Sequence, residues 1–468
     1  MAALNAPDVP TYLPPRELRT KLVAVAASTG ALFGFSIAAV NQTLEQIRAE
    51  FGLSSLDKGI VVSSLVVGAL AGCVCASALT DRLGQRLILC WAGVLGTAAS
   101  VVGAVSPDEA VLSLARFLVG FAVGVTSAVS PMLLAELATA HRRGSLVTLY
   151  QLSLTVGVLI ALVLGLVASA QGEWRLMFAA NGVPALVQAV AVLLLPPAPG
   201  DLVARGRQQD AMAVLRATRG PVEAAQVLED FGAFQSSRAG SLLRGLVRPE
   251  TRVPVAIALG AALMNALVGI GAVVYYSTLV FASAGVGGQL GAEVATLSIG
   301  VMNVVASVAA LTLISRFGRR PLLAVGLSGI SGSLCVAAFG LIAGGGSVSG
   351  PLTIGAVLVF IACFAFSAGP LAWLIMAEVT PREIRAGVAG TALALNWAAN
   401  LLVALLFPVI VGTPGSPTRV GVVFLVFAAF SVVFLVAFRR YVPETKDRSL
   451  AELQNAFRER GGRSTGPS

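Results

Sequence analysis

Residues 59–86 read GIVVSSLVVGALAGCVCASALTDRLGQR, and this stretch decides what kind of fold the chain adopts. Positions 59–80 contain no charged side chain. A helix of about 20 such residues crosses the ~30 Å of hydrocarbon in a lipid bilayer. The charges then arrive together, in Asp81-Arg82-Leu83-Gly84-Gln85-Arg86, as expected of a short loop that leaves the membrane. The stretch therefore predicts a transmembrane helix followed by a tight turn into the next one.

The composition of the whole chain has the same character. Of 468 residues, 56% are hydrophobic and 12% are charged, and the mean hydropathy is +0.87. Soluble domains carry about 25% charged residues. This chain therefore has too few polar side chains to cover the water-exposed surface of a soluble fold. Apolar runs like 59–80 recur at 22–42, 59–80, 87–106, 111–134, 147–169, 177–196, 254–282, 294–314, 321–343, 352–377, 386–411 and 418–438. The sequence predicts an all-α integral membrane protein with twelve transmembrane helices.

The longest polar stretch divides these runs into two sets of six that resemble each other. The loop 81–86 has a counterpart in Ser315-Arg316-Phe317-Gly318-Arg319-Arg320, and Glu136 has a counterpart in Glu378. A parallel repeat is typical of transporters whose two bundles rock about a central site. We predict an N-terminus (1–21), a six-helix bundle (22–196), a linker with short helices near Gln208–Arg216 and Glu223–Asp230 (197–253), a second bundle (254–438) and a tail (439–468).

The basic residues predict how the chain lies in the membrane. If the N-terminus is cytoplasmic, inner segments hold all but five of the 32 Lys and Arg residues. The positive-inside rule then places both termini and the linker in the cytoplasm, most simply at the cell membrane. The net charge of +9 follows from this topology and from contact with lipid headgroups, so we expect no nucleic-acid partner. The exceptions are Arg48, Lys58, Arg116, Arg175 and Arg419.

A further set of motifs carries a resemblance to a known family. These are Arg116, Gly120, Gly124, Pro131, Glu136, Arg143-Gly144 and Gln151; Phe317-Gly318-Arg319-Arg320-Pro321-Leu322-Leu323; Gly369-Pro370, Trp373, Glu378, Arg385, Asn396-Trp397 and Asn400; and Pro443-Glu444-Thr445-Lys446. In this order and spacing they resemble the sugar porter family of the major facilitator superfamily, over nearly the whole chain. The resemblance implies two pseudo-symmetric six-helix bundles that carry a sugar-like solute by alternating access.

Acids and bases alternate at the predicted inner helix ends. Opposite charges in a partly dehydrated seam attract more strongly than the ~0–1 kcal/mol of exposed pairs. We therefore expect an inner-face charge network that locks the two bundles together; the alternative is a set of topology determinants that reach the headgroups. Ser315 stands where the family has an acid, which predicts a weaker second cluster. The network comprises Asp81, Arg82, Arg86, Glu136, Arg143, Arg316, Arg320, Glu378, Arg385 and Glu444.

Polar side chains inside the apolar runs are the candidates for solute binding. Such residues are costly in a membrane and usually face a cavity or another helix. Amides both donate and accept hydrogen bonds, which suits solute hydroxyls, although bonding between helices is the alternative for each. By resemblance, Gln151, Asn303, Trp373 and Asn400 match sugar-contacting residues of the family. The full candidate set is Gln151, Asn265, Asn303, Trp373, Asn396 and Asn400.

The seventh run departs from the family pattern. Tyr275 and Tyr276, which the resemblance assigns to the outer gate, are present, but the family's long amides are not. Ala266 and Gly271 are expected to leave space without donors, which predicts a solute bulkier or less hydroxylated than glucose at that point. Gly200 is a second departure, since the family has an arginine there.

The first run also lacks a group that the family uses. Ser36 stands where proton-coupled relatives have an aspartate, and we assign it to the gate together with Arg116. None of the 23 acids lies in the middle of an apolar run. Proton coupling needs a titratable group that both sides can reach in turn. The sequence therefore predicts facilitated diffusion without proton coupling.

Other functions remain as alternatives. A proton-driven drug or metabolite exporter would usually carry an acid within a span and a Gly-Pro element in the fifth span. The fifth apolar run here, 147–169, has no proline. A non-transporting solute sensor would need an output domain, and only 439–468 follows the last run. One histidine and no acid cluster leave no catalytic constellation, so an enzyme is not expected. We expect no metal, no cofactor and a monomer.

Overall fold

Helices of membrane-spanning length account for most of the described residues. The computed structural model describes residues 15–41, 43–221, 223–228, 249–286, 288–343, 349–381, 384–412 and 415–444. Within these residues, twelve helical segments are long and apolar enough to cross a membrane. The predicted fold class is confirmed. In the first half they are α1 (Arg16–Ala38), α3 (Ser55–Leu83), α4 (Gln85–Ala104), α5 (Glu109–Leu137), α6 (Ala140–Gln171) and α7 (Trp174–Leu193).

The second half repeats this set, with two of its spans each built from two helices. Short helices flank the bundles: α2 (Leu44–Phe51), α8 (Pro199–Ala204) and α9 (Gln208–Arg219). The spans of the second half are α12 (Pro249–Leu267) with α13 (Ile270–Ser283), α14 (Gly288–Arg316), α15 (Arg319–Ala343), α16 (Ser349–Phe366) with α17 (Ala368–Val379), α18 (Arg385–Val411) and α19 (Pro417–Tyr441).

The spans predicted at 254–282 and 352–377 are present, and each is interrupted once. Between α12 and α13, Gly269 adopts φ +97°, a left-handed conformation that glycine reaches without strain. Between α16 and α17, Ser367 has φ −126° and ψ −92°, and Pro370 then fits the first turn of α17. Non-helical backbone at membrane depth is tolerated where it is buried in protein or lines a cavity, and broken spans form the solute site in many transporters.

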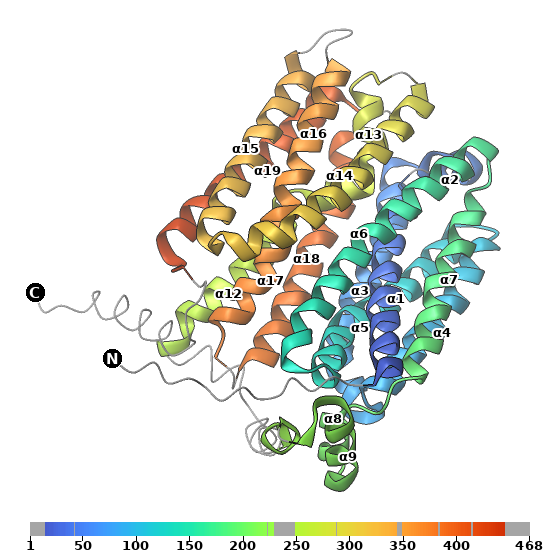
Figure 1. Cartoon of the computed structure of the whole chain (residues 1–468). Helices are drawn as coiled ribbons and strands as arrows, with labels where there is room; N and C mark the ends of the chain where they lie inside the picture. Colours follow the sequence, from blue (N-terminus) through green and yellow to red (C-terminus); the bar gives the residue numbers. More distant parts are fainter. Residues whose placement is uncertain are drawn as a thin grey trace, which may run out of the picture.

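The halves lie side by side, the first blue to green and the second yellow to red (Figure 1). They meet where α3 packs against α18 and where α6 packs against α14. Within the first half, glycines bring α3 and α5 into backbone contact. A Cβ built at Gly68 or Gly72 would meet carbonyl oxygens of α5, and one at Gly120 or Gly124 would meet those of α3. Such small-residue contacts let helices approach closely where lipid gives no hydrophobic drive.

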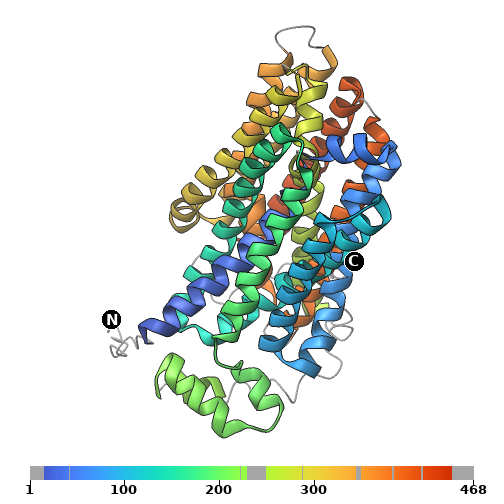
Figure 2. The same cartoon turned by 90° about the vertical axis from the view of Figure 1, so that its right-hand side faces the viewer.

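The start of α1 and the helices α8 and α9 lie at one end of the molecule, and α2 lies at the other (Figures 1 and 2). We call these the inner and the outer end. Helix α9 confirms the helix predicted near Gln208–Arg216, and residues 223–228 are also helical. Residues 229–248 of the linker, most of the N-terminal segment and the tail from 445 lie outside the described residues.

Candidate functional site

Three of the predicted amides form a hydrogen-bonded chain beside the two helix breaks. Asn265 Nδ2 donates to the carbonyls of Ala368 and Gly369 at 3.2 and 3.4 Å, which ties α12 to the start of α17. Asn396 Nδ2 donates to Asn265 Oδ1 at 3.1 Å, and Asn400 Nδ2 donates to Asn396 Oδ1 at 3.2 Å. The alternative that the sequence left open, bonding between helices, therefore holds for Asn265 and Asn396.

The chain of amides ends on an oxygen that is available to a ligand. Asn400 Oδ1 has no hydrogen-bond donor among the described residues. It faces Gly271, where a built Cβ would lie 2.8 Å from this oxygen and 3.3 Å from the ring of Tyr275. Ala266 is fully buried. The expectation of open space at Gly271 is therefore wrong, because Asn400 and Tyr275 already fill it.

The remaining predicted side chains lie on α6, α14 and α17. Gln151, Asn303 and Trp373 are half-buried, and none of them has a hydrogen-bond partner within the described chain. Gln151 comes from α6 and Asn303 from α14, the helix pair through which the halves pack. Trp397 of α18 contacts Phe33 of α1 with ring centroids 5.4 Å apart and the rings tilted by 35°, so this contact too joins the halves.

The indole of Trp397 was not among the predicted solute contacts, although the sequence motif contained it. Its Nε1 is buried and has no acceptor among the described residues. A buried N–H without a partner is costly, about 1–3 kcal/mol, unless a ligand or water accepts from it. Trp397 therefore joins Asn400 as a site where the protein offers an unused hydrogen-bonding atom.

At the outer end of the seam, Asn41 joins the two halves, and this amide was not among the predicted residues. The Asn41 Nδ2 donates to the Val274 carbonyl at 2.6 Å and to Ser277 Oγ at 2.7 Å. Its Oδ1 accepts from the backbone N–H and the hydroxyl of Thr278 at 3.3 and 3.0 Å. In a regular α-helix the Thr278 N–H would bond to the Val274 carbonyl. Non-helical angles at Tyr276 interrupt α13, and the Asn41 amide of the other half bonds to both groups.

The two tyrosines of the predicted gate have different surroundings. Tyr276 donates to the Ala404 carbonyl at 2.5 Å and stacks on Phe407 with centroids 5.1 Å apart, which fixes it to α18. Tyr275 has no hydrogen-bond partner among the described residues and lies next to Asn400 across Gly271. Tyr275 is therefore the member of the pair that can reach a solute.

Ser36 and Arg116, the other predicted gate residues, line one cavity inside the first half. Ser36 Oγ donates to Asn181 Oδ1 of α7 at 2.8 Å. Arg116 is 3% exposed, and its Nε donates to the Val61 carbonyl of α3 at 2.6 Å. Asn41 and Asn181 carried the same signal as the predicted amides, a polar side chain in or beside an apolar run, and could have been found by it.

At the inner end of the first half, carboxylates hold the loop between α3 and α4. Gln85 Nε2 donates to Glu136 Oε1 at 2.7 Å, and the Gly200 N–H donates to Oε2 at 3.1 Å. Asp201 accepts from the backbone N–H of Gln85 at 2.6 Å, at the positive end of α4. A Cβ at Gly200 would lie 2.9 Å from Glu136, so glycine here lets the backbone bond to this carboxylate directly.

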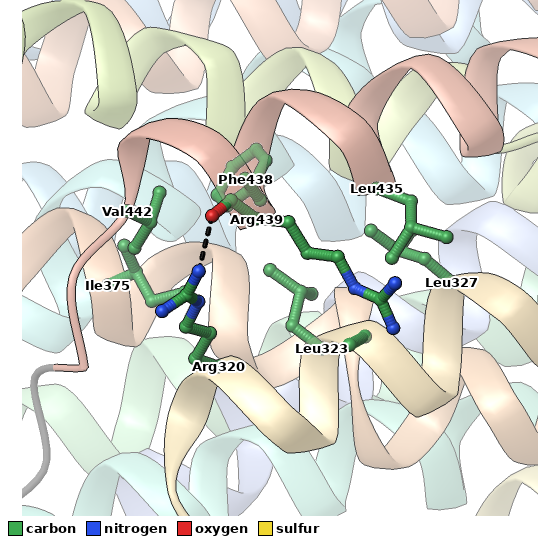
Figure 3. Close-up of a pocket in the computed structure, with 9 residues that line it drawn as sticks. Arg320, Leu323, Leu327, Ile375, Leu435, Phe438, Arg439 and Val442 are labelled. Atoms are coloured by element: carbon green, nitrogen blue, oxygen red, sulfur yellow. Dashed lines mark hydrogen bonds between the residues drawn. The ribbon is translucent and has the colours of Figure 1, made fainter.

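The second half repeats this arrangement. Arg319 and Glu378 form an ion pair at 3.0 Å, in the places of Gln85 and Glu136. Glu444 accepts from the backbone N–H groups of Arg319 and Arg320 at 2.9 and 3.1 Å, and so caps α15 as Asp201 caps α4. The Arg320 side chain reaches α19 and donates to a backbone carbonyl there (Figure 3).

The remaining members of the network lie at inner helix ends, with the Arg86 guanidinium bonded to the Leu193 carbonyl. They are Asp81, Arg82, Arg86 and Arg316. The side chains of Ser315, Arg143 and Arg385 lie outside the described ones. Each inner-face hydrogen bond named above joins segments of the same half, whereas those of Asn41 join the two halves at the outer end. This conformation is closed outside, and a lock between the bundles at the inner face stays a prediction for the opposite state.

No group of three His, Cys, Asp or Glu side chains within the described segments could hold a metal ion. The site instead offers unpaired amide, hydroxyl and indole groups along an aromatic-lined seam. Such groups bind neutral hydroxylated molecules through hydrogen bonds and ring stacking.

Comparisons with known proteins agree with this chemistry. A family model described as "Sugar (and other) transporter" matches residues 22–457. The putative metabolite transport protein YwtG of Bacillus subtilis is 31% identical over 434 residues, 92% of this chain and 94% of its own. The galactose-proton symporter of Escherichia coli K12 is 33% identical over 435 residues, 92% of each chain. The E. coli proton:xylose symporter XylE, solved with 6-bromo-6-deoxy-D-glucose, is 27% identical with a TM-score of 0.79, over 94% of this chain and 99% of that one.

Proposed function

The chain belongs to the sugar (and other) transporter family of the major facilitator superfamily, and we propose that it moves a small neutral hydroxylated solute, a sugar or polyol, by alternating access. The observation that carries the proposal is the amide chain that begins on the backbone of the α16–α17 break and ends on the free Asn400 Oδ1. Because Asn265 and Asn396 hold it in place, Asn400 presents a pre-positioned acceptor to the seam between the halves.

Selectivity is proposed to depend on the side of the site formed by span seven. Ala266 and Gly271 provide no donor there, and Gly271 lies against Asn400 and Tyr275. Asn400 Oδ1 can accept from one hydroxyl at this wall, but a further hydroxyl placed against Ala266 would lose its partner, at about 1–3 kcal/mol. We therefore expect a solute that is less hydroxylated than glucose on the face toward Ala266, and not a bulkier one.

Uptake into proteoliposomes against labelled pentoses, hexoses, deoxy sugars and inositols tests the proposal. One of these solutes should be taken up saturably, and Asn400→Ala should raise its KM. The matched control is Gln188→Ala, which removes a buried amide bonded to Leu89 and Thr126 within the first half only. Uptake of none of the panel, or equal KM effects of the two substitutions, would contradict the proposed site.

Transport is proposed to proceed without proton coupling. What supports this is Ser36, whose hydroxyl bonds to the neutral Asn181 in the cavity that Arg116 also lines. Solute should therefore equilibrate without accumulating, and flux should be insensitive to a proton uncoupler. If protons were coupled, the described residue to test is Glu293 of α14, a carboxylic acid that is 1% exposed. Uphill accumulation under an imposed proton gradient would refute facilitated diffusion, and its loss in Glu293→Gln would assign the coupling to that residue.

The location is proposed to be the cell membrane, with both termini and the linker in the cytoplasm and the protein a monomer. The excess of Lys and Arg in the predicted inner segments supports this orientation. A membrane-impermeant thiol reagent applied from outside should label a cysteine introduced near Asp108 and spare one near Gln209. The opposite labelling pattern would reverse the topology.

A further inference from the structure

Arg116 is a buried cation of the first half that has no carboxylate partner among the described residues. The cavity that Ser36, Arg116 and Asn181 line has room for about one water-sized sphere. Its other lining side chains are apolar, so Arg116 is the one charged residue in its wall. A cavity this small inside a helix bundle cannot hold a sugar, so it is separate from the solute site proposed above.

The guanidinium of Arg116 is only partly satisfied by the protein. Its Nε donates to the Val61 carbonyl at 2.6 Å and its Nη2 to the Val62 carbonyl at 3.4 Å, both on α3. Its Cζ lies 5.9 Å from the centre of the Phe178 ring. No described residue accepts from its Nη1. Arg116 therefore keeps unused donors in a wall that it shares with Ser36 and Asn181.

The polar groups opposite Arg116 are neutral dipoles. Asn181 Nδ2 donates to Ser100 Oγ at 3.0 Å, which leaves its second N–H without an acceptor among the described residues. Backbone carbonyls and a ring face stabilise a guanidinium, but they carry no formal charge. An arginine buried in a membrane protein without a counter-charge loses several kcal/mol of hydration, which such dipoles replace incompletely.

We propose that this cavity binds a monatomic anion such as chloride, which pairs with Arg116 and stabilises the outer-closed conformation. The site offers a cation and an amide N–H, both suited to an anion. Its volume excludes polyatomic anions such as gluconate. The carbonyls that bind Arg116 belong to α3, which packs against α18 of the other half. Neutralising Arg116 therefore stabilises the packing of the first half beneath the closed outer end.

Thermal unfolding of the purified full-length protein in detergent tests the proposal without reference to the solute. Sodium chloride or bromide is titrated against sodium gluconate at constant ionic strength. Because a ligand that binds only the folded state raises its stability, chloride and bromide should raise the apparent Tm saturably by about 2 °C or more over gluconate. Equal Tm values in chloride and gluconate would mean that the cavity holds water only, and would overturn the proposal.

Two substitutions at Arg116 give the decisive comparison, because a larger side chain at Ser36 would itself fill a cavity of this size. Arg116→Lys keeps the cation and should keep a chloride response. Arg116→Gln is neutral and should abolish it. A chloride response that survives in Arg116→Gln, or one that Arg116→Lys loses equally, would refute an anion paired with Arg116. Failure to find a transported sugar would leave this result unaffected.

Discussion

The Asn41 amide should control how far the outer end of the transporter is closed. Its four hydrogen bonds join the first half to α13, and Asn41 is 5% exposed. Hydrogen bonds between membrane helices contribute about 0.6 kcal/mol each on average, so Asn41→Ala should remove about 2 kcal/mol from the closed state. In the open state water reaches these groups, and the loss there is small. The open-to-closed ratio should therefore rise roughly 30-fold.

Electron–electron distance measurements between spin labels can detect this shift. The labels replace Leu56 of α3 and Val294 of α14, which are 54% and 51% exposed near the outer ends of opposite halves. The five native cysteines are first replaced. A protein that is ~97% closed would become about evenly divided, so Asn41→Ala should show a second, longer distance population.

The reasoning would be refuted by an unchanged distance distribution in Asn41→Ala. The control is again Gln188→Ala, whose bonds to Leu89 and Thr126 stay within one half, and it should leave the distribution as in the parent. An equal shift in both variants would mean that general loosening, not the bridge between the halves, opens the outer end.

Three further outcomes follow from the contacts. Asn400→Ala should weaken solute binding by about 1–3 kcal/mol in equilibrium titrations, whereas Asn265→Ala, which frees the α17 backbone, should chiefly lower the thermal stability. Gly120→Ala forces a Cβ into the Leu65 carbonyl and should lower the Tm. Gly260→Ala has open space around it and should leave the free energy of unfolding unchanged or raise it by up to about 1 kcal/mol. Equal losses of stability in both variants would contradict the packing argument. Hydrogen bonds from Arg175 and Trp174 lower the pKa of Glu50, so its contribution is complete at neutral pH and is lost as the pH falls through that lowered pKa. Glu50→Gln should then lower the free energy of unfolding at pH 7 by less than about 1 kcal/mol, because the pair is exposed, and the resulting small difference in Tm from the parent should vanish in acid.

The candidate site was only partly predictable, because the type of a side chain does not say which groups it forms hydrogen bonds with. The amides were located from their chemistry in apolar runs. Asn265 uses both donors on backbone carbonyls of α17, while Asn400 keeps a free oxygen, and nothing in the sequence distinguishes the two. The same holds for Tyr275 and Tyr276, neighbours with opposite surroundings.

What the sequence determined alone is whatever depends on a residue and its near neighbours in the chain. Hydropathy over about 20 residues is such a quantity, and it predicted the twelve spans and the fold class. The repeated loops at 81–86 and 315–320 predicted two related halves for the same reason.

The tertiary structure decided what depends on partners far away in the chain. The breaks at Gly269 and Ser367 lie inside unbroken apolar runs, where hydropathy gives no sign of them. The closing of the outer end depends on Asn41 meeting carbonyl and N–H groups more than 230 positions away, exposed only because α13 is interrupted. Glu136 bonds to the backbone of Gly200, because packing brings that N–H within 3.1 Å. Hydrogen bonds act over about 3 Å in space, and only folding sets which groups lie that close.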